Sequence, residues 1–248
     1  MPRTQRKKSS TGIYHVVFRG INKQQIFEDK EDYDRFLSLL KQYQSICGYT
    51  MYAYCLMPNH IHLLIKEGKE DLGKIFKRIG ASFVYWYNLK YSRVGHLFQD
   101  RYKSEAVEDD AYLLTVIRYI HRNPVKAGLC SEPEEYCYSS FPQYETDPLI
   151  GSGFIFDMIG QDEFYRYQHI RNDDVCLDIE EQEKKRLTDQ EAKRIMAEKY
   201  HCGSASEFQA ADKTTQEQLL HTLLSSGGSL RQISRLTGAT IGTIRKCY

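Results

Sequence analysis

Apolar positions in the first part of the chain alternate between strand-like runs and helical periodicity. Residues 12–19 are rich in β-branched and aromatic side chains and end at Gly20, which predicts a strand. In Glu31–Cys47, large apolar residues recur at three- and four-residue spacing and Gly48 follows as a stop signal. This segment is therefore expected to be an amphipathic helix.

A hairpin and a second helix are expected next. The strand-like runs Tyr49–Met57 and His60–Ile65 flank Pro58-Asn59, a pair typical of tight turns. The periodic segment from Asp71 to about Lys90 predicts another long helix.

The pattern closes with one more strand and one more helix. Leu97–Val107 is expected to be a strand, and Asp110–Arg122 a helix broken at Asn123-Pro124, because proline disfavours helical geometry in the residue before it. The order strand, helix, strand, strand, helix, strand is that of a split βαβ unit. We therefore expect an α+β fold with a ferredoxin-like antiparallel sheet in a first domain spanning residues 1–145.

The rest of the chain predicts two further regions. Residues 146–185 are expected to form an acidic linker or peripheral segment whose aromatic residues pack in part on the first domain. In residues 186–248, Thr188 and Glu191 match a capping box, and a turn at Leu236-Thr237-Gly238 precedes a second helix from about Thr240. This region is expected to be a helical, DNA-binding helix-turn-helix domain.

Charge is distributed unevenly along the chain, although the net charge is only +1. Residues 1–130 carry 21 basic against 13 acidic side chains, residues 131–185 carry 4 against 14, and residues 186–248 carry 9 against 6. Basic segments favour phosphate backbones without specifying a sequence.

Other functional classes are disfavoured by composition. No apolar run is long enough for a membrane span, so we expect no membrane association and a cytoplasmic location. Seven scattered cysteines without a C-x-x-C pair argue against a disulfide framework or a zinc knuckle.

His60 and His62 are the first candidates for chemistry. Side chains alternate in a strand, so both imidazoles should project from one face and could share a divalent metal. Taken alone, such a pair is more often structural. Tyr119 and Asn123 lie four apart on one helix face, and Tyr112 shares that face, so phenol and amide could reach the same point if this helix crosses the histidines.

Several motifs together resemble a known family over about residues 9–142. They are Tyr14-His15-Val16 with Arg19-Gly20, Met57-Pro58-Asn59-His60-Ile61-His62-Leu63-Leu64, Gly95–Gln99 with Arg101-Tyr102-Lys103-Ser104, Arg118-Tyr119-Ile120, Asn123-Pro124-Val125-Lys126-Ala127-Gly128-Leu129 and Tyr138-Ser139-Ser140. In this order they resemble the HUH-type single-tyrosine transposases of the IS200-like superfamily, and among them the REP-associated tyrosine transposases.

The resemblance implies a metal-dependent endonuclease and strand transferase acting on single-stranded or hairpin DNA through a 5′-phosphotyrosine intermediate. It assigns His60 and His62 as ligands of Mg²⁺ or Mn²⁺, Asn123 as the residue that completes the metal shell, and Tyr119 as the nucleophile. Related enzymes often carry Gln as the third ligand, so the shorter Asn123 is a departure that could act through a water. A homodimer that exchanges the tyrosine helix is left open.

DNA contacts are expected from polar residues in the basic N-terminal arm, near the first strand, before the third helix and in the last helix. These residues are Arg3, Arg6, Lys7, Lys8, His15, Arg19, Asn22, Gln99, Arg101, Lys103 and Arg245.

Two other functions remain open from the sequence. The first is a catalytically inactive, domesticated transposase that regulates by binding structured DNA or RNA, although such a protein has no chemical reason to keep His60, His62 and Tyr119. The second is a zinc-dependent hydrolase, which is weaker because the region offers no further His, Asp or Glu at ligand spacing.

Overall fold

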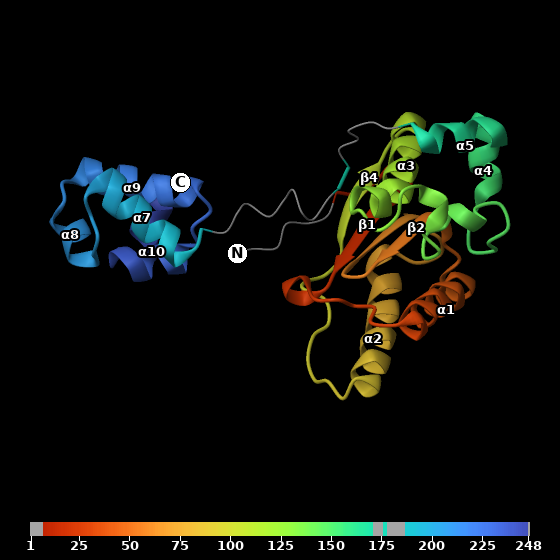
Figure 1. Ribbon diagram of the computed structural model, residues 1–248, viewed down its shortest axis with the longest axis horizontal. Coiled ribbons are helices and arrows are strands. Elements are labelled where there is room, and N and C mark those ends of the chain that lie inside the picture. The colour runs from red at the N-terminus through yellow and green to blue at the C-terminus, as the bar shows by residue number, and fades with distance from the viewer. Residues whose placement is uncertain (1–6, 171–175, 178–186, 248) are drawn as a thin grey trace. The chain divides into compact units, whose positions relative to one another are not determined.

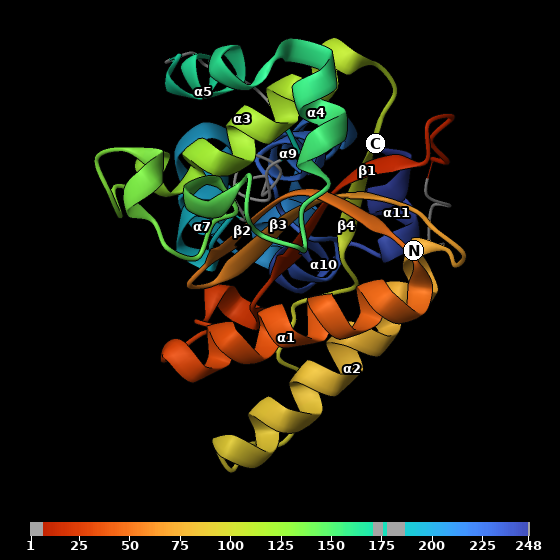
Figure 2. The same ribbon diagram turned by 90° about the vertical axis from the view of Figure 1, so that its right-hand side faces the viewer.

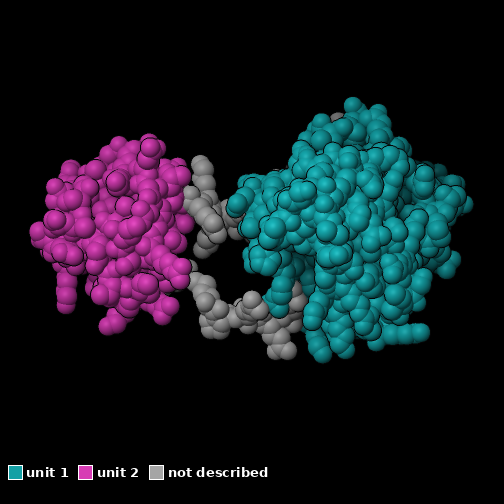
Figure 3. Space-filling model, turned by 90° about the horizontal axis from the view of Figure 1, so that it is seen from below, with its two compact units in different colours: residues 1–178 teal, residues 179–248 magenta. Residues whose placement is uncertain are grey.

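The chain forms two compact units, residues 1–178 and 179–248 (Figures 1 and 3). The computed structural model describes residues 7–170, 176–177 and 187–247.

A four-stranded sheet is the centre of the first unit. Its strands are β1 (Ile13–Arg19), β2 (Thr50–Met57), β3 (His60–Lys66) and β4 (Lys103–Val107), in the spatial order β2-β3-β1-β4. All neighbouring strands are antiparallel. Helix α1 (Lys30–Cys47) connects β1 to β2, and α2 (Leu72–Lys90) connects β3 to β4. The predicted mixture of helices with an antiparallel sheet is confirmed.

Helices cover both faces of this sheet (Figure 2). Helices α1 and α2 lie together on one face, where Phe18 of β1 packs edge-on against Phe76 of α2. Helix α3 (Asp110–Lys126) lies on the opposite face, mainly over β2 and β3. Odd-numbered residues of β1 and even-numbered residues of β3 point toward α3, because directly paired residues share a face.

Two expectations about local structure were wrong. The strand predicted over Leu97–Val107 begins only at Lys103, because Gln99, Asp100 and Arg101 are exposed polar residues that interrupt the apolar alternation after a brief pairing with the end of β1. The third helix does not break at Asn123-Pro124 but continues to Lys126. Pro124 is buried, and its carbonyl accepts the Leu129 N–H, so packing and the C-terminal turn offset the bond that proline cannot donate.

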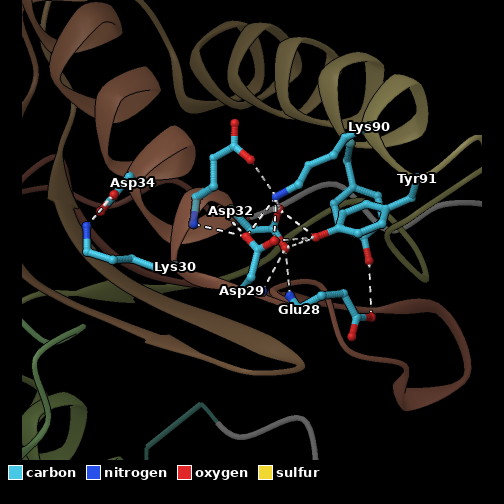
Figure 4. Close-up of polar contacts among 9 residues, drawn as sticks. Glu28, Asp29, Lys30, Asp32, Asp34, Lys90 and Tyr91 are labelled. Atoms are coloured by element: carbon cyan, nitrogen blue, oxygen red, sulfur yellow. Dashed lines mark hydrogen bonds and ion pairs between the residues drawn. The ribbon is translucent and has the colours of Figure 1, made fainter.

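A buried carboxylate joins the start of α1 to the end of α2 (Figure 4). Asp32 is completely buried and accepts hydrogen bonds from the Glu28 N–H at 2.6 Å, the Lys90 ammonium at 2.9 Å and the Tyr91 hydroxyl at 2.9 Å. Asp29 caps α1 through a capping box with Asp32 and also binds Lys90. The network fixes the angle between the two helices.

Replacing Asp32 by Asn should destabilise the first unit by about 2 to 3 kcal/mol, because charge-assisted bonds are lost and an amide N–H₂ is turned toward buried donors. Denaturant unfolding of the full chain measures this effect. Asp34→Asn is the matched control on the same helix: it removes an exposed pair with Lys30 and should change stability by less than about 0.5 kcal/mol. Equal effects of both variants would contradict the role given to Asp32.

Residues after α3 extend the first unit. Short 3₁₀ turns occupy Pro133–Glu135 and Phe141–Gln143. A turn of the same kind lies much earlier in the chain, at Ile21–Lys23, directly after β1. Helices α4 (Ser152–Ile159) and α5 (Gln161–His169) come next. Ile155 and Phe164 are completely buried in the core of this unit, so α4 and α5, which lie in the region expected to be an acidic linker or peripheral segment, pack on the first unit.

The second unit is helical in its described part. It contains α7 (Asp189–Tyr200), α8 (Ala205–Ala210), α9 (Lys213–Ser225), α10 (Leu230–Thr237) and α11 (Ile241–Lys246) around a separate apolar core. The capping box of Thr188 and Glu191 is confirmed. Gly238 adopts a left-handed conformation between α10 and α11, and Thr240 caps α11 as expected.

None of the helices in the described ranges has the combination of length and apolar content that crossing a membrane requires.

Candidate active site

His60 and His62 project from one face of β3, as predicted. Their ring centres lie 5.0 Å apart, and they stand directly opposite Arg19 and Val17 of β1. Ile61, between them, is completely buried on the other face. The pair is therefore presented on the face that α3 covers.

Each histidine is oriented through its Nδ1 atom. His60 Nδ1 lies 2.6 Å from Asn59 Oδ1, in the hairpin turn. His62 Nδ1 lies 3.0 Å from Nε2 of His15, which is completely buried on β1. The Nε2 atom of His62 is buried and has no hydrogen-bond partner among the described residues. His62 therefore has its Nε2 left for a ligand.

The electrostatic surroundings keep His62 neutral. Burial lowers the pKa of His62 well below its usual range, and the nearby positive charges of His60, His15 and Lys126 lower this pKa further. A metal-binding imidazole must be unprotonated. The donor type and orientation of the pair, together with the unprotonated state of His62, therefore suit a divalent cation at His60 and His62.

Tyr119 reaches the histidines from α3. Its ring centre lies 5.8 Å from that of His62 and 5.9 Å from that of His15, and the residue is 6% exposed. The ammonium of Lys126 lies 5.6 Å from the centre of the Tyr119 ring. The structure thus brings a phenol, three imidazoles and a cation to one place.

Asn123, one turn beyond Tyr119, is buried at the same site. It is 7% exposed, and its Nδ2 lies 3.4 Å from the Tyr119 carbonyl. This long contact directs the amide nitrogen back along the helix. The role of Asn123 as a third metal ligand stays a prediction.

The comparisons with known proteins concern this same part of the chain. Residues 8–123 match the family model described as "Transposase IS200 like". A putative REP-associated tyrosine transposase from Haemophilus influenzae is 31% identical over 120 residues, which are 44% of this chain and 68% of that protein. The chain belongs to the IS200-like transposase family.

The fold of the first unit is similar to a solved member of this group. The structure of a REP-associated tyrosine transposase bound to a REP hairpin aligns with a TM-score of 0.52 at 18% identity, covering 60% of this chain and 88% of that one. At this identity the likeness concerns the fold. Within this transposase the family match includes His60, His62, Tyr119 and Asn123 and ends before Pro124.

Tyr112 shares a helix face with Tyr119 but has a different environment. Its hydroxyl donates a 2.7 Å hydrogen bond to Glu105 Oε2, which also accepts the Leu177 N–H. Burial and this bond raise the pKa of Tyr112 well above its usual range. The Tyr112 hydroxyl is thus bonded to a carboxylate of β4, whereas the Tyr119 ring lies among cationic and imidazole groups.

The residues predicted to contact DNA occupy varied positions in the transposase. Five are exposed in the first unit, namely Lys7, Lys8, Asn22, Gln99 and Arg101, and Lys103 is partly exposed. Arg19 and His15 are buried in the strand β1, and His15 belongs to the histidine cluster. Arg245 is exposed on α11 of the second unit, and Arg3 and Arg6 lie outside the described residues. Their contacts with DNA stay predictions.

Sequence reasoning did not assign the roles of two residues at the site, of which His15 was expected only to contact DNA. The contact of His15 with His62 depends on the register of β1 against β3, which no local pattern reveals. Lys126 was detectable, because it follows Tyr119 by seven residues, or two turns, and so shares its helix face.

Proposed function

We propose that the first unit of this transposase, a ferredoxin-like fold by its strand order, is a metal-dependent single-stranded DNA endonuclease and strand transferase with Tyr119 as the nucleophile. The observation that carries the proposal is the approach of the Tyr119 ring to within 5.8 Å of His62 on the face that presents the histidine pair. Few structural roles need a buried phenol beside a histidine whose Nδ1 is held by a second imidazole.

His60 and His62 would hold Mg²⁺ or Mn²⁺, with Asn123 completing the shell directly or through a water. A divalent cation supplies charge withdrawal from a non-bridging phosphate oxygen and orients the phosphodiester for in-line displacement. Imidazole ligands favour Mn²⁺ by affinity, whereas cellular abundance favours Mg²⁺.

The protein groups then carry the bond changes. The Tyr119 oxygen forms a bond to phosphorus, and the phenolic proton passes to solvent. The bond from phosphorus to the 3′ oxygen breaks, and this oxygen takes a proton from solvent and leaves as a free 3′-hydroxyl. The positive charge of Lys126 beside the ring stabilises the phenolate that attacks. Because the 5′-phosphotyrosine preserves the bond energy, another 3′-hydroxyl can reverse the reaction and join the strand to a new end.

Hairpin DNA is the proposed substrate, since the relative of similar fold is bound to a REP hairpin and the exposed basic residues of the first unit suit a phosphate backbone. We propose that the second unit adds a further DNA contact through α10 and α11, with Arg245 exposed on α11.

Incubation with a labelled library of single-stranded hairpin oligonucleotides and Mn²⁺ tests the function. The expected result is a protein band that keeps labelled DNA through denaturation. Hairpin binding without any adduct, across the library and with either metal, would instead favour the binding-only regulator.

Deleting residues 186–248 should leave a folded protein that still forms the adduct, because every residue of the proposed active site lies in the first unit and the two apolar cores are separate. Binding strength or site choice should change, by an expected 10-fold or more if α11 contacts phosphates. Adduct assays and gel shifts on the truncated chain measure both effects. A truncated protein that folds but cuts no oligonucleotide would show that the second unit takes part in catalysis.

A further inference from the structure

A chain of buried hydrogen bonds, called the polar chain here, holds α3 on the flank away from Tyr119. His121 is completely buried, with Nε2 2.8 Å from Ser140 Oγ and Nδ1 3.0 Å from Oε1 of Gln168 on α5. The Tyr54 N–H of β2 donates to Ser140 Oγ at 3.0 Å. The polar chain therefore runs from the sheet, through Ser140 and His121, to α5.

The protons of the polar chain have one consistent arrangement. Burial lowers the pKa of His121 to about 4, so its ring is neutral at pH 7 and has one donor and one acceptor. Because Oε1 of Gln168 faces Nδ1, Nδ1–H donates to it, and Nε2 accepts the Ser140 hydroxyl proton at 2.8 Å in preference to the Tyr54 carbonyl, which lies 3.3 Å from Ser140 Oγ. Each contact has a fixed direction, which defines the orientation of the ring.

The outer side of α3 is also tied to α5. The guanidinium of Arg118 lies 4.0 Å from the centre of the Tyr167 ring, and Arg122 Nη1 donates to the Gln168 carbonyl at 3.3 Å. Figure 2 shows α3 on the face of the sheet opposite to α1 and α2, with α5 beyond it. Both α5 and Ser140 lie after residue 123, where the family match ends.

Helix geometry connects the polar chain to the nucleophile. Successive residues turn by about 100°, so Tyr119 and His121 point to different flanks of α3, about 160° apart. Rolling α3 about its axis would move both side chains at once. Holding His121 at Ser140 and Gln168 therefore also sets the direction in which Tyr119 points.

Burying Gln168 costs more free energy than burying an apolar residue of similar size. It is completely buried, and its Nε2 has no hydrogen-bond partner among the described residues. A leucine would fill a similar volume without burying an unpaired amide donor. What the glutamine adds is the bond to His121.

We propose that His121 is a positioning residue: held between Ser140 and Gln168, it fixes the rotation of α3 and thereby keeps the Tyr119 oxygen directed at the phosphodiester bound beside His60 and His62. This rests on the proposed function of Tyr119. Residues 140–168 thus complete the active site without touching the DNA.

The test uses Gln168→Leu in the full chain, with 3-fluorotyrosine incorporated at position 119 and Mn²⁺ as the metal probe. The kcat of hairpin cleavage should fall about 10- to 100-fold with KM unchanged, because a small misplacement of a nucleophile slows chemistry more than binding. Paramagnetic broadening of the fluorine signal by Mn²⁺ should weaken in the variant, since it reports the distance from Tyr119 to the ion.

Two further variants separate positioning from folding. The double variant His121→Leu, Gln168→Leu removes both buried polar partners, so its thermal stability should recover while kcat stays low. Arg166→Ala removes an exposed contact on the same helix α5 and should match the wild type in kcat and broadening.

Each outcome decides a specific point. Wild-type kcat and broadening in Gln168→Leu, or recovery of kcat together with stability in the double variant, would overturn the positioning role. A wild-type protein that forms no adduct and shows no broadening would overturn the proposed function, and the positioning role with it.

Discussion

Replacing Tyr119 by Phe should abolish the covalent attachment of DNA, with a loss of more than about 10³-fold in adduct formation, while hairpin binding and metal binding persist. The change deletes only the phenolic oxygen and leaves the ring against His62 and His15. We expect no second nucleophile to replace it, because the hydroxyl of Tyr112, the other tyrosine on this face of α3, is bonded to Glu105.

Tyr112→Phe is the matched control on the same helix. The two rings are separated by seven residues, or about 10 Å along the axis. The Tyr112 hydroxyl is bonded to Glu105, so its loss should leave adduct formation within a factor of about three. Mass spectrometry of the DNA-linked peptide identifies the modified residue, and a phosphonucleotide on Tyr112 would defeat the assignment.

His62→Ala is expected to have the second largest effect. It removes the imidazole whose Nε2 is left for a ligand, so Mn²⁺ binding should become undetectable by calorimetry and cleavage should fall by about 10³-fold or more. Hairpin affinity, measured by gel shift with EDTA, should change little, because phosphate contacts supply most of it. Full cleavage by this variant in a chelating buffer would remove the metal from the proposal.

Replacing His15 by Ala should have a smaller effect on Mn²⁺ binding than replacing His62. His15 orients His62 through Nδ1 without facing the ligand itself, so His15→Ala should weaken Mn²⁺ binding about 10- to 100-fold rather than abolish it. His221→Ala, an exposed histidine of the second unit, should leave Mn²⁺ affinity unchanged. Equal losses for His15 and His62 would show that His15 is itself a ligand.

Elements defined by local patterns could be predicted from the sequence. The β-branched run before Gly20, the Pro58-Asn59 turn and the periodicity ending at Gly48 gave β1, the hairpin and α1 close to their observed bounds. In these segments the hydrophobic period and the punctuating residue agree, and tertiary packing only reinforces them.

Features that depend on tertiary packing could not be predicted from the sequence. Pro124 stays helical because burial and the turn that follows compensate for its missing donor. The aromatic residues of the acidic region predicted some packing on the first domain, but its composition did not predict the two regular helices α4 and α5. At the site, the spacing of His60 and His62 and of Tyr119 and Asn123 identified the partners on each element. The contacts of His15 with His62 and of His121 with Ser140 and Gln168 join residues 19 to 47 positions apart, which no periodicity encodes.

If the histidine pair on β3 holds the proposed ion, its placement has a consequence for how that ion can be exchanged. Strand β3 is bonded on both sides, to β1 and β2, and both Nδ1 atoms already have partners within the protein. The ligands are therefore rigid before any cation arrives, unlike those of small zinc domains that fold around their metal. Removing the ion should abolish activity but hardly change the cooperativity of unfolding. The protein could therefore lose its ion, bind a different divalent cation and regain activity without unfolding.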